Sequence, residues 1–191
     1  KGLQGEHGLS LLVDTGEHRL LFDTGASDLF IRNARILGID LKEVDFLVLS
    51  HGHRDHTGGL HHFLAVNDKA QVVCKRELFR PKFKDERENG VMQPDALDST
   101  RFRFVDEVTE LCRGVFVFPQ LPVTDEEDTH FEHFFTWTEG RKQADTFTDE
   151  LALALKQGAE VSVLSACSHR GITNIIRAVQ EYFPQTSLKL V

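Results

Sequence analysis

The fold of this chain is decided by residues 45–56, which read Asp45-Phe46-Leu47-Val48-Leu49-Ser50-His51-Gly52-His53-Arg54-Asp55-His56. The first half is a short, nearly all-apolar run, which predicts a strand buried on both faces. The second half places three histidines and an aspartate directly after that strand, where α/β proteins commonly gather functional groups. The segment therefore predicts a functional site at the end of a buried strand.

Regular elements are predicted on both sides of this segment. Upstream, residues 8–22 alternate strand, turn and strand, which indicates a hairpin. Residues 27–37 follow as a helix, with Ser27 as its N-cap and Gly38 as its stop. Downstream, a helix is expected from Gly58 to about Val66 and a strand at 71–74.

The second half of the chain is less regular. Residues 80–100 are charged and are expected to form a loop or insertion. No helices or strands are assigned in residues 124–149, whose aromatic residues are expected in the core or at a substrate site. Strands are expected at 101–105, 115–118, 150–155, 161–165 and 187–191, and a helix is expected at 171–182. Residues 150–155 could also form a helix, because Ala and Leu favour one. Strands interleaved with helices predict an α/β or α+β fold, and 191 residues suit one domain.

Composition excludes several classes of protein. A net charge of −8 argues against a general nucleic-acid binder, and no apolar run is long enough to span a membrane. The three cysteines form no CxxC pair or disulfide framework, which favours a reducing cytoplasm. The expected partner is a small-molecule substrate, and the oligomeric state stays open.

Histidine is the unusual residue, with ten in the chain and five of them between positions 51 and 62. His51 and His53, two apart, can point at one ion, and Asp55 and His56 can supply an oxygen and a nitrogen to a neighbouring ion. These donors suit one or two divalent ions, zinc first and manganese or iron as alternatives. The competing interpretation is a polar loop rich in histidine by accident.

Glycines and further histidines surround this cluster. Gly52, Gly58 and Gly59 would let the backbone close around an ion. His61 and His62 are expected to be surface or packing residues.

The cluster and four other segments together resemble the metallo-β-lactamase superfamily. More closely, they resemble its branch of β-lactamase-type metal-dependent hydrolases, which also contains the archaeal dihydropterin ribofuranosylaminobenzene phosphate synthase. The segments that carry the resemblance are residues 6–10, 21–25, 50–60, 149–153 and 164–175.

The resemblance implies an α+β fold, a four-layer αββα sandwich with the metals at one edge between the two sheets. It makes His51 and His53 ligands of a first ion, and Asp55 and His56 ligands of a second. Asp23 would support the motif loop through hydrogen bonds. Alternatively, Asp23 is an ordinary aspartate of a strand-end turn.

Further ligands are expected outside the cluster. In Cys167-Ser168-His169 either Cys167 or His169 could reach the metals; His169 is favoured, with Cys167 a ligand or a packed core thiol. The branch usually ends in a Gly-Gly-x-His-Leu segment, which would begin where this chain stops, and His130 or His133 could substitute for its histidine. Because the chain also starts at Lys1, residues 1–191 are expected to be a single domain incomplete at both ends.

The implied activity is hydrolysis of an ester, lactone, amide or phosphoester by a hydroxide held at one or two divalent ions. Asp55 would be catalytic, because it would ligate an ion and orient that hydroxide. One alternative is a transferase-like synthase that joins a pterin to a phosphorylated ribosyl-aminobenzene. Another is a non-catalytic metal-binding module, since the fold would survive the loss of a ligand.

Overall fold

The computed structural model describes residues 2–92, 97 and 99–191. Its first five-stranded sheet contains the predicted buried strand at its centre. In spatial order the strands are β1 (Leu11–Asp14), β2 (Arg19–Phe22), β3 (Phe46–Val48), β4 (Gln71–Cys74) and β7 (Phe102–Phe104). β1 and β2 form the predicted antiparallel hairpin, and β2, β3, β4 and β7 are mutually parallel neighbours.

The second five-stranded sheet is built mostly from the last third of the chain. In spatial order its strands are β14 (Ser187–Leu190), β13 (Glu160–Leu164), β12 (Ala152–Gln157), β9 (Val115–Phe118) and β8 (Thr109–Cys112). Only the pairing of β13 with β14 is parallel. Residues 150–155, which could form a helix by propensity, instead contribute to strand β12. Both faces of this strand are covered, by the first sheet and by α4.

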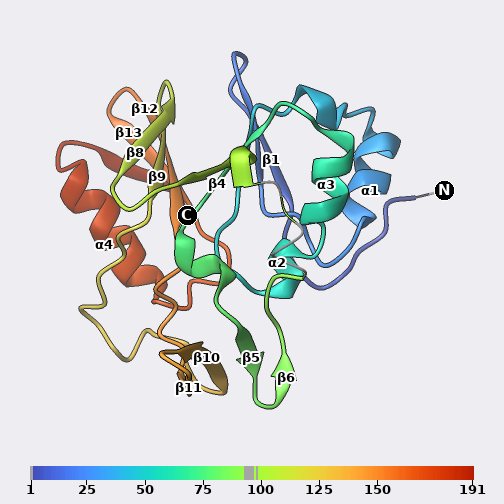
Figure 1. Ribbon diagram of the computed structural model, residues 1–191. Helices are drawn as coiled ribbons and strands as arrows, with labels where there is room; N and C mark the ends of the chain where they lie inside the picture. The colour runs from blue at the N-terminus through green and yellow to red at the C-terminus, as the bar shows by residue number, and fades with distance from the viewer. Residues whose placement is uncertain (1, 93–96, 98) are drawn as a thin grey trace.

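Helices cover the outer faces of the two sheets (Figure 1). On the first sheet lie α1 (Leu29–Leu37) and α3 (Leu60–Val66), and on the second lies α4 (Ile172–Tyr182). Short helical turns connect the elements: η1 (Leu41–Glu43), η2 (Arg76–Phe79) and η4 (Ser99–Arg101).

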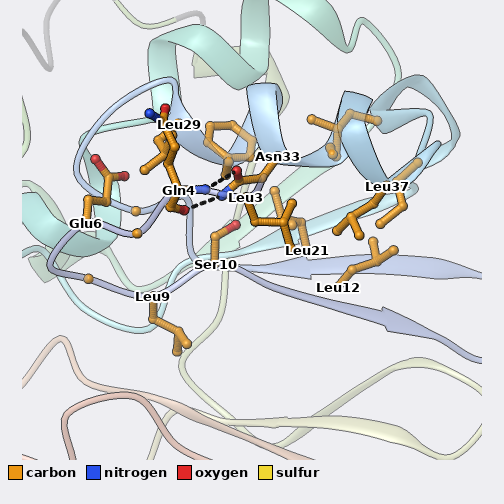
Figure 2. A pocket seen from close by; sticks show the side chains of 17 residues that line it. Leu3, Gln4, Glu6, Leu9, Ser10, Leu12, Leu21, Leu29, Asn33 and Leu37 are labelled. Carbon is orange, nitrogen blue, oxygen red and sulfur yellow. Dashed lines mark hydrogen bonds between the residues drawn. The ribbon is translucent and has the colours of Figure 1, made fainter. Parts of the chain in front are cut away.

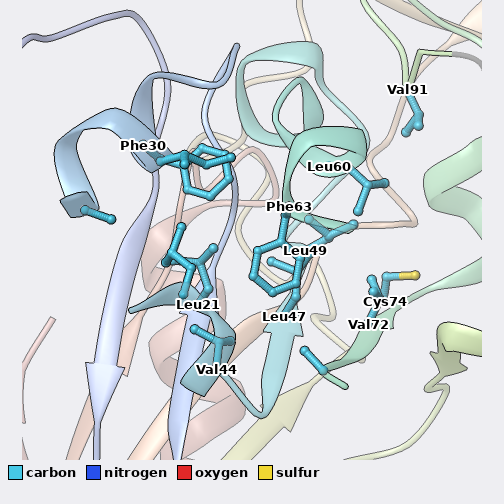
Figure 3. Close-up of a cluster of buried hydrophobic side chains, with 14 of the residues drawn as sticks. Leu21, Phe30, Val44, Leu47, Leu49, Leu60, Phe63, Val72, Cys74 and Val91 are labelled. Carbon is cyan, nitrogen blue, oxygen red and sulfur yellow. The ribbon is translucent and has the colours of Figure 1, made fainter. Parts of the chain in front are cut away.

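Alternation along the strands divides the core into three apolar layers. Leu21 and Leu47 pack under α1 and α3 (Figure 3). Their neighbours Phe22 and Val48 instead face the second sheet and meet residues such as Leu153. A third cluster lies between the second sheet and α4. This confirms the four-layer αββα sandwich.

A third, smaller sheet was not predicted. It projects at the end of the sandwich where the histidine motif lies (Figure 1). Its strands, in spatial order, are β11 (Arg141–Ala144), β10 (Phe134–Thr138), β5 (Lys82–Lys84) and β6 (Arg87–Glu88). The prediction of a loop over 80–100 is thus wrong where β5 and β6 form, while 93–96 and 98 lie outside the described residues. These strands are short and charged, and β5 pairs with β10 from a distant part of the sequence, so no local pattern indicates them.

The helix boundaries depart slightly from expectation. The short helix α2 (Arg54–Thr57) forms within the histidine motif itself, and α3 begins only at Leu60. The N-cap position of α1 is Asp28 rather than Ser27. Ser27 Oγ accepts a hydrogen bond from the backbone of Leu29. Gly38 ends α1 as predicted, with a left-handed φ of 71°.

Across the described ranges, the helices are too short or too polar for any of them to cross a bilayer.

Candidate metal centre

Two groups of potential metal donors meet at the end of β3. The first, called the buried group, consists of His51, His53 and His169, whose donor atoms lie within 4.8 Å of one another. Their ring centroids are 4.7 to 5.1 Å apart, and all three side chains are at most 6% exposed. Each Nε2 atom is buried without a hydrogen-bond partner among the described residues. Three such nitrogens aimed at one another are expected of a ligand set and costly otherwise.

The second, called the open group, consists of Asp55, His56 and Cys167. His56 Nε2 lies 3.2 Å from Cys167 Sγ and 3.4 Å from Asp55 Oδ2. His56 is buried, whereas Cys167 is exposed, so the alternative of Cys167 as a packed core thiol is wrong. This group therefore joins the buried site to solvent.

His51 lies within reach of both groups, because it also clusters with His56 and Cys167. Its Nδ1 is 2.9 Å from Ser50 Oγ, which leaves only Nε2 for an ion. One imidazole nitrogen has one lone pair and ligates one ion. Cys167 and His169, between which the sequence left the choice open, lie in different donor groups, and their role as ligands stays a prediction.

Asp23 organises the inner side of both groups. Its carboxylate accepts hydrogen bonds from Ser50 N at 2.7 Å, from Ser50 Oγ at 2.6 Å and from His56 Nδ1 at 2.7 Å. With Nδ1 of His56 bonded to Asp23, Nε2 of His56 points toward Cys167 and Asp55. The backbone of Asp23 has a φ of 61°, a conformation that these bonds hold in place. The supporting role expected of Asp23 is confirmed.

His169 is held by a different set of contacts. Its Nδ1 lies 3.0 Å from the carbonyl oxygen of His130, its backbone N donates to Glu150, and its ring stacks on Phe147 at 3.7 Å. His130 thus contributes its carbonyl, and neither donor group includes its ring or that of His133. His133 instead pairs with Asp85 in the turn between β5 and β6, and both side chains are exposed to solvent.

The two groups have opposite electrostatics. Burial, reinforced by neighbouring histidines, holds the pKa of His51 well below its usual range and lowers the pKa of His53 to about 2 and that of His169 to about 4. Burial also opposes charge on His56, but hydrogen bonds with Asp23 and Asp55 outweigh it and raise the pKa to about 12.

Asp55 stays ionised in this setting. Burial works to raise the pKa of its carboxyl, but the hydrogen bond and charge of His56 lower it to about 2. The buried group therefore presents neutral imidazoles, and the open group presents a charged pair.

The motif glycines are required by close approach. A Cβ on Gly52 would lie 2.3 Å from the carbonyl oxygen of Leu78, and one on Gly59 would lie 2.3 Å from that of Thr24. Real Cβ atoms do not come this close, so any larger residue would force the motif away from its neighbours. The close backbone packing expected at these glycines is therefore present, while closure of the backbone around an ion stays a prediction.

The N-terminal segment lies along α1 (Figure 2), and Gly8 packs against the backbone of Asp55 in the motif. Gln4 and Asn33 exchange two hydrogen bonds there, next to a cavity of about 340 Å³. Glu6 accepts hydrogen bonds from the backbone at the start of α1. The exposed His7 then reaches Asp55, with Nε2 3.3 Å from Oδ2.

Sequence reasoning missed a buried polar network beneath the ligands. It comprises Lys82, Asp145 and Asp149, all buried, with Lys82 Nζ donating to both carboxylates. The only signal was the pair Asp149-Glu150 directly before an apolar strand. Nothing marked Lys82, which lies in a segment rich in other charges.

The donors fit a divalent metal ion. Imidazole nitrogens with a thiolate and a carboxylate are the ligands that zinc and related ions take. The buried Nε2 atoms lack any other partner in the described structure, and the hydrogen bonds on the far side of His51, His56 and His169 are those expected of ligands. The cluster is thus a candidate divalent-metal site.

An αββα sandwich with a histidine-rich site at the edge between its sheets defines a class of metal-dependent proteins. The chain belongs to the metallo-beta-lactamase superfamily, whose family model matches residues 3–148.

Individual relatives refine this assignment. The chain is 29% identical over 192 residues to a 7,8-dihydropterin-6-methyl-4-(β-D-ribofuranosyl)-aminobenzene-5′-phosphate synthase of Methanocaldococcus jannaschii, covering 90% of this chain and 64% of that protein. The crystal structure of Tm1679, a metal-dependent hydrolase of the β-lactamase superfamily, matches with a TM-score of 0.80 and 34% identity, over 95% of this chain and 67% of the other. The metallo-β-lactamase MIM-1 from Novosphingobium pentaromativorans shares the fold at a TM-score of 0.54 and 18% identity, over 95% of this chain and 68% of that one. The chain thus spans about two thirds of the length of the curated relatives it matches.

Proposed function

We propose that this chain is the metal-binding part of a hydrolase that uses one or two divalent ions, with zinc the first to test. The observation that carries the proposal is the convergence of three buried, unpartnered Nε2 atoms beside a second donor group that opens to solvent. Membership of a superfamily composed largely of metal-dependent hydrolases supports it.

The two groups would divide the ligands between them. His51, His53 and His169 would hold one ion, and Asp55, His56 and Cys167 would hold a second. When bound, such ions polarise a substrate oxygen and lower the pKa of water toward neutrality.

The chain's own residues prepare the site for that chemistry. Asp55 is ionised and 21% exposed in its side chain, so it can accept a hydrogen bond from a water at the open group and orient it. On the other side, Phe134 and Phe147 pack against His53 and His169 with ring centroids 3.7 to 5.1 Å apart and exclude water. Substrate would therefore approach past Cys167.

Suitable substrates are esters, lactones, amides and phosphoesters, because each presents a polarised oxygen to an ion and a bond that water can break.

A second candidate is a synthase that uses the same ions without net hydrolysis. It is favoured by the similarity to the archaeal synthase, which extends over 90% of this chain. A pterin substrate with a phosphorylated partner would distinguish it, because product would form without consumption of water.

The test combines metal analysis with a substrate panel. Purified protein, His53→Ala and the matched control His62→Ala, an exposed histidine on α3, would be analysed for zinc, manganese and iron. They would then be assayed with p-nitrophenyl esters, lactones, a β-lactam and bis-p-nitrophenyl phosphate. We expect metal and turnover in the wild type and the control and their loss in His53→Ala. Turnover that survives His53→Ala unchanged would contradict the proposal, and bound metal without turnover of any substrate would favour a non-catalytic module.

A further inference from the structure

A buried lysine lies directly beneath the candidate metal centre. Lys82, at the start of β5, is 2% exposed, and its Nζ contacts Asp145 at 2.6 Å and Asp149 at 2.8 Å. Burial opposes its charge, but the two carboxylates outweigh this and raise the pKa of Lys82 above its ordinary value. Because burying such ions costs free energy, the network calls for a role beyond stability.

One arm of the network reaches the loop that carries His51 and His53. Asp149 Oδ2 accepts a hydrogen bond of 2.7 Å from the backbone N of Gly52, the residue between them. Gly52 also packs on the lysine itself, since a Cβ there would lie 2.9 Å from Lys82 Cε. The carboxylate of Asp149 therefore connects Lys82 directly to the loop that carries His51 and His53.

The other arm reaches His169 from the opposite direction. Asp145 Oδ1 accepts a hydrogen bond of 2.8 Å from the backbone N of Phe147. The Phe147 ring stacks on His169 at 3.7 Å with an interplanar angle of 10°, and Lys82 Nζ lies 5.3 Å from the centre of that ring. The ammonium therefore ties together segments that are distant in sequence.

We propose that Lys82 is a positioning residue of the metal centre, which through Asp149 and Asp145 fixes the His51–His53 loop and the Phe147–His169 stack at the separation needed for one ion. The inference rests on the proposed metal site and adds to it the residue that sets its geometry.

The chain offers closely matched variants to test this. Lys82→Met keeps the length of the side chain and removes its charge, and Lys82→Arg restores the charge. Asp149→Asn keeps the shape but weakens the link to Gly52. Lys84→Met, two residues along the same strand and exposed, is the control for loss of a lysine.

The experiment is a titration of metal-free protein with Co²⁺ followed by its visible absorption, with competition by a chelator for affinity. Thermal unfolding of each metal-free variant is measured alongside. We expect Lys82→Met and Asp149→Asn to bind about 10–100-fold more weakly and to give an altered Co²⁺ spectrum, Lys82→Arg to recover much of the affinity, and Lys84→Met to match the wild type.

Wild-type affinity and spectrum in both Lys82→Met and Asp149→Asn would overturn the proposal while leaving the metal site intact. Wild-type protein that binds no Co²⁺ would overturn the proposed function as well, so the two failures are distinguishable. If Lys82→Met does not fold, Asp149→Asn and Lys82→Arg decide the outcome by the same spectrum.

Discussion

The buried and open groups differ in almost every physical respect although they share one edge of the sandwich. The buried group consists of neutral imidazoles whose Nε2 atoms have no partner among the described residues. The open group contains an ionised carboxylate and an exposed thiol, each in contact with His56, whose pKa is raised.

This difference indicates that the two groups have different roles in binding ions and substrate. A site of buried, preoriented nitrogens loses little entropy when an ion binds and admits little else. A site with its own charges and an open side can exchange ligands and accept a substrate. We therefore expect the buried group to dominate ion binding and the open group to respond to substrate, and the following changes test that contrast.

The largest effect is expected from His169→Ala. It removes one of three ligands of the buried group, so we expect turnover to fall by about 10³-fold, a cost of ~4 kcal/mol, with loss of bound metal. Steady-state kinetics and metal analysis measure both, and His133→Ala, at an exposed residue just before β10, is the control. An equal loss of turnover and bound metal in the two variants would contradict the assignment of His169 as a ligand and of His133 as a residue outside the site.

Asp23→Ala tests the link between the groups. It leaves His56 and Ser50 without their buried acceptor, so we expect a loss of about 3–5 kcal/mol in the free energy of unfolding of the metal-free protein. Urea titration measures it. Asp14→Ala, on the exposed side of the same hairpin, should change stability far less, and a similar cost for both would contradict the role of Asp23.

Cys167→Ser acts on the open group alone. We expect the affinity for a second zinc ion to fall roughly 10-fold or more, because a hydroxyl is a poorer zinc ligand than a thiolate, while the first ion binds as before. Isothermal titration separates the two steps, with Cys112→Ser on β8 as the control. Loss of the first step instead would show that the two groups are not independent.

Per pH unit, the smallest expected effect is a pH dependence of the free energy of unfolding that has opposite sign in the two groups. His53 has its pKa lowered to about 2 in the fold, so below its ordinary value of 6.5 the unfolded chain takes up a proton that the folded chain refuses. Its contribution to stability is therefore lost as the pH falls, by about 1.4 kcal/mol per pH unit below about 6.5.

His56 has its pKa raised to about 12. Its contribution is present below about 6.5 and is lost as the pH rises toward about 12. Urea titrations of metal-free protein across this pH range, with His53→Gln and His56→Gln, measure both slopes. A flattened acid limb in His53→Gln and a flattened alkaline limb in His56→Gln are expected, and the same change in both variants would contradict the contrast.

The sequence was most informative where its signals are local. The apolar run 45–50 predicted a strand buried on both faces, and β3 indeed separates two apolar layers with Leu47 and Val48. The motif after it carries four of the six donors within six positions. Period-2 alternation and motif spacing require no knowledge of distant partners.

Tertiary contacts decided what the sequence could not. Cys167 and His169 lie two positions apart yet serve different groups, because Ser168 between them has a left-handed φ of 52° that turns the chain. Lys82 is one charged residue among many until β5 pairs with β10 and brings it beneath Gly52. The small sheet was not predicted for the same reason, since its strands are defined by pairing with distant segments rather than by a local sequence pattern.

The central claim is that the buried group holds a divalent ion. The most direct test is crystallography of zinc-loaded protein with data collected on both sides of the zinc absorption edge. We expect an anomalous difference peak at coordinating distance from Nε2 of His51, His53 and His169. Zinc-loaded crystals in which those three nitrogens surround no peak, while peaks lie elsewhere on the protein, would contradict the account.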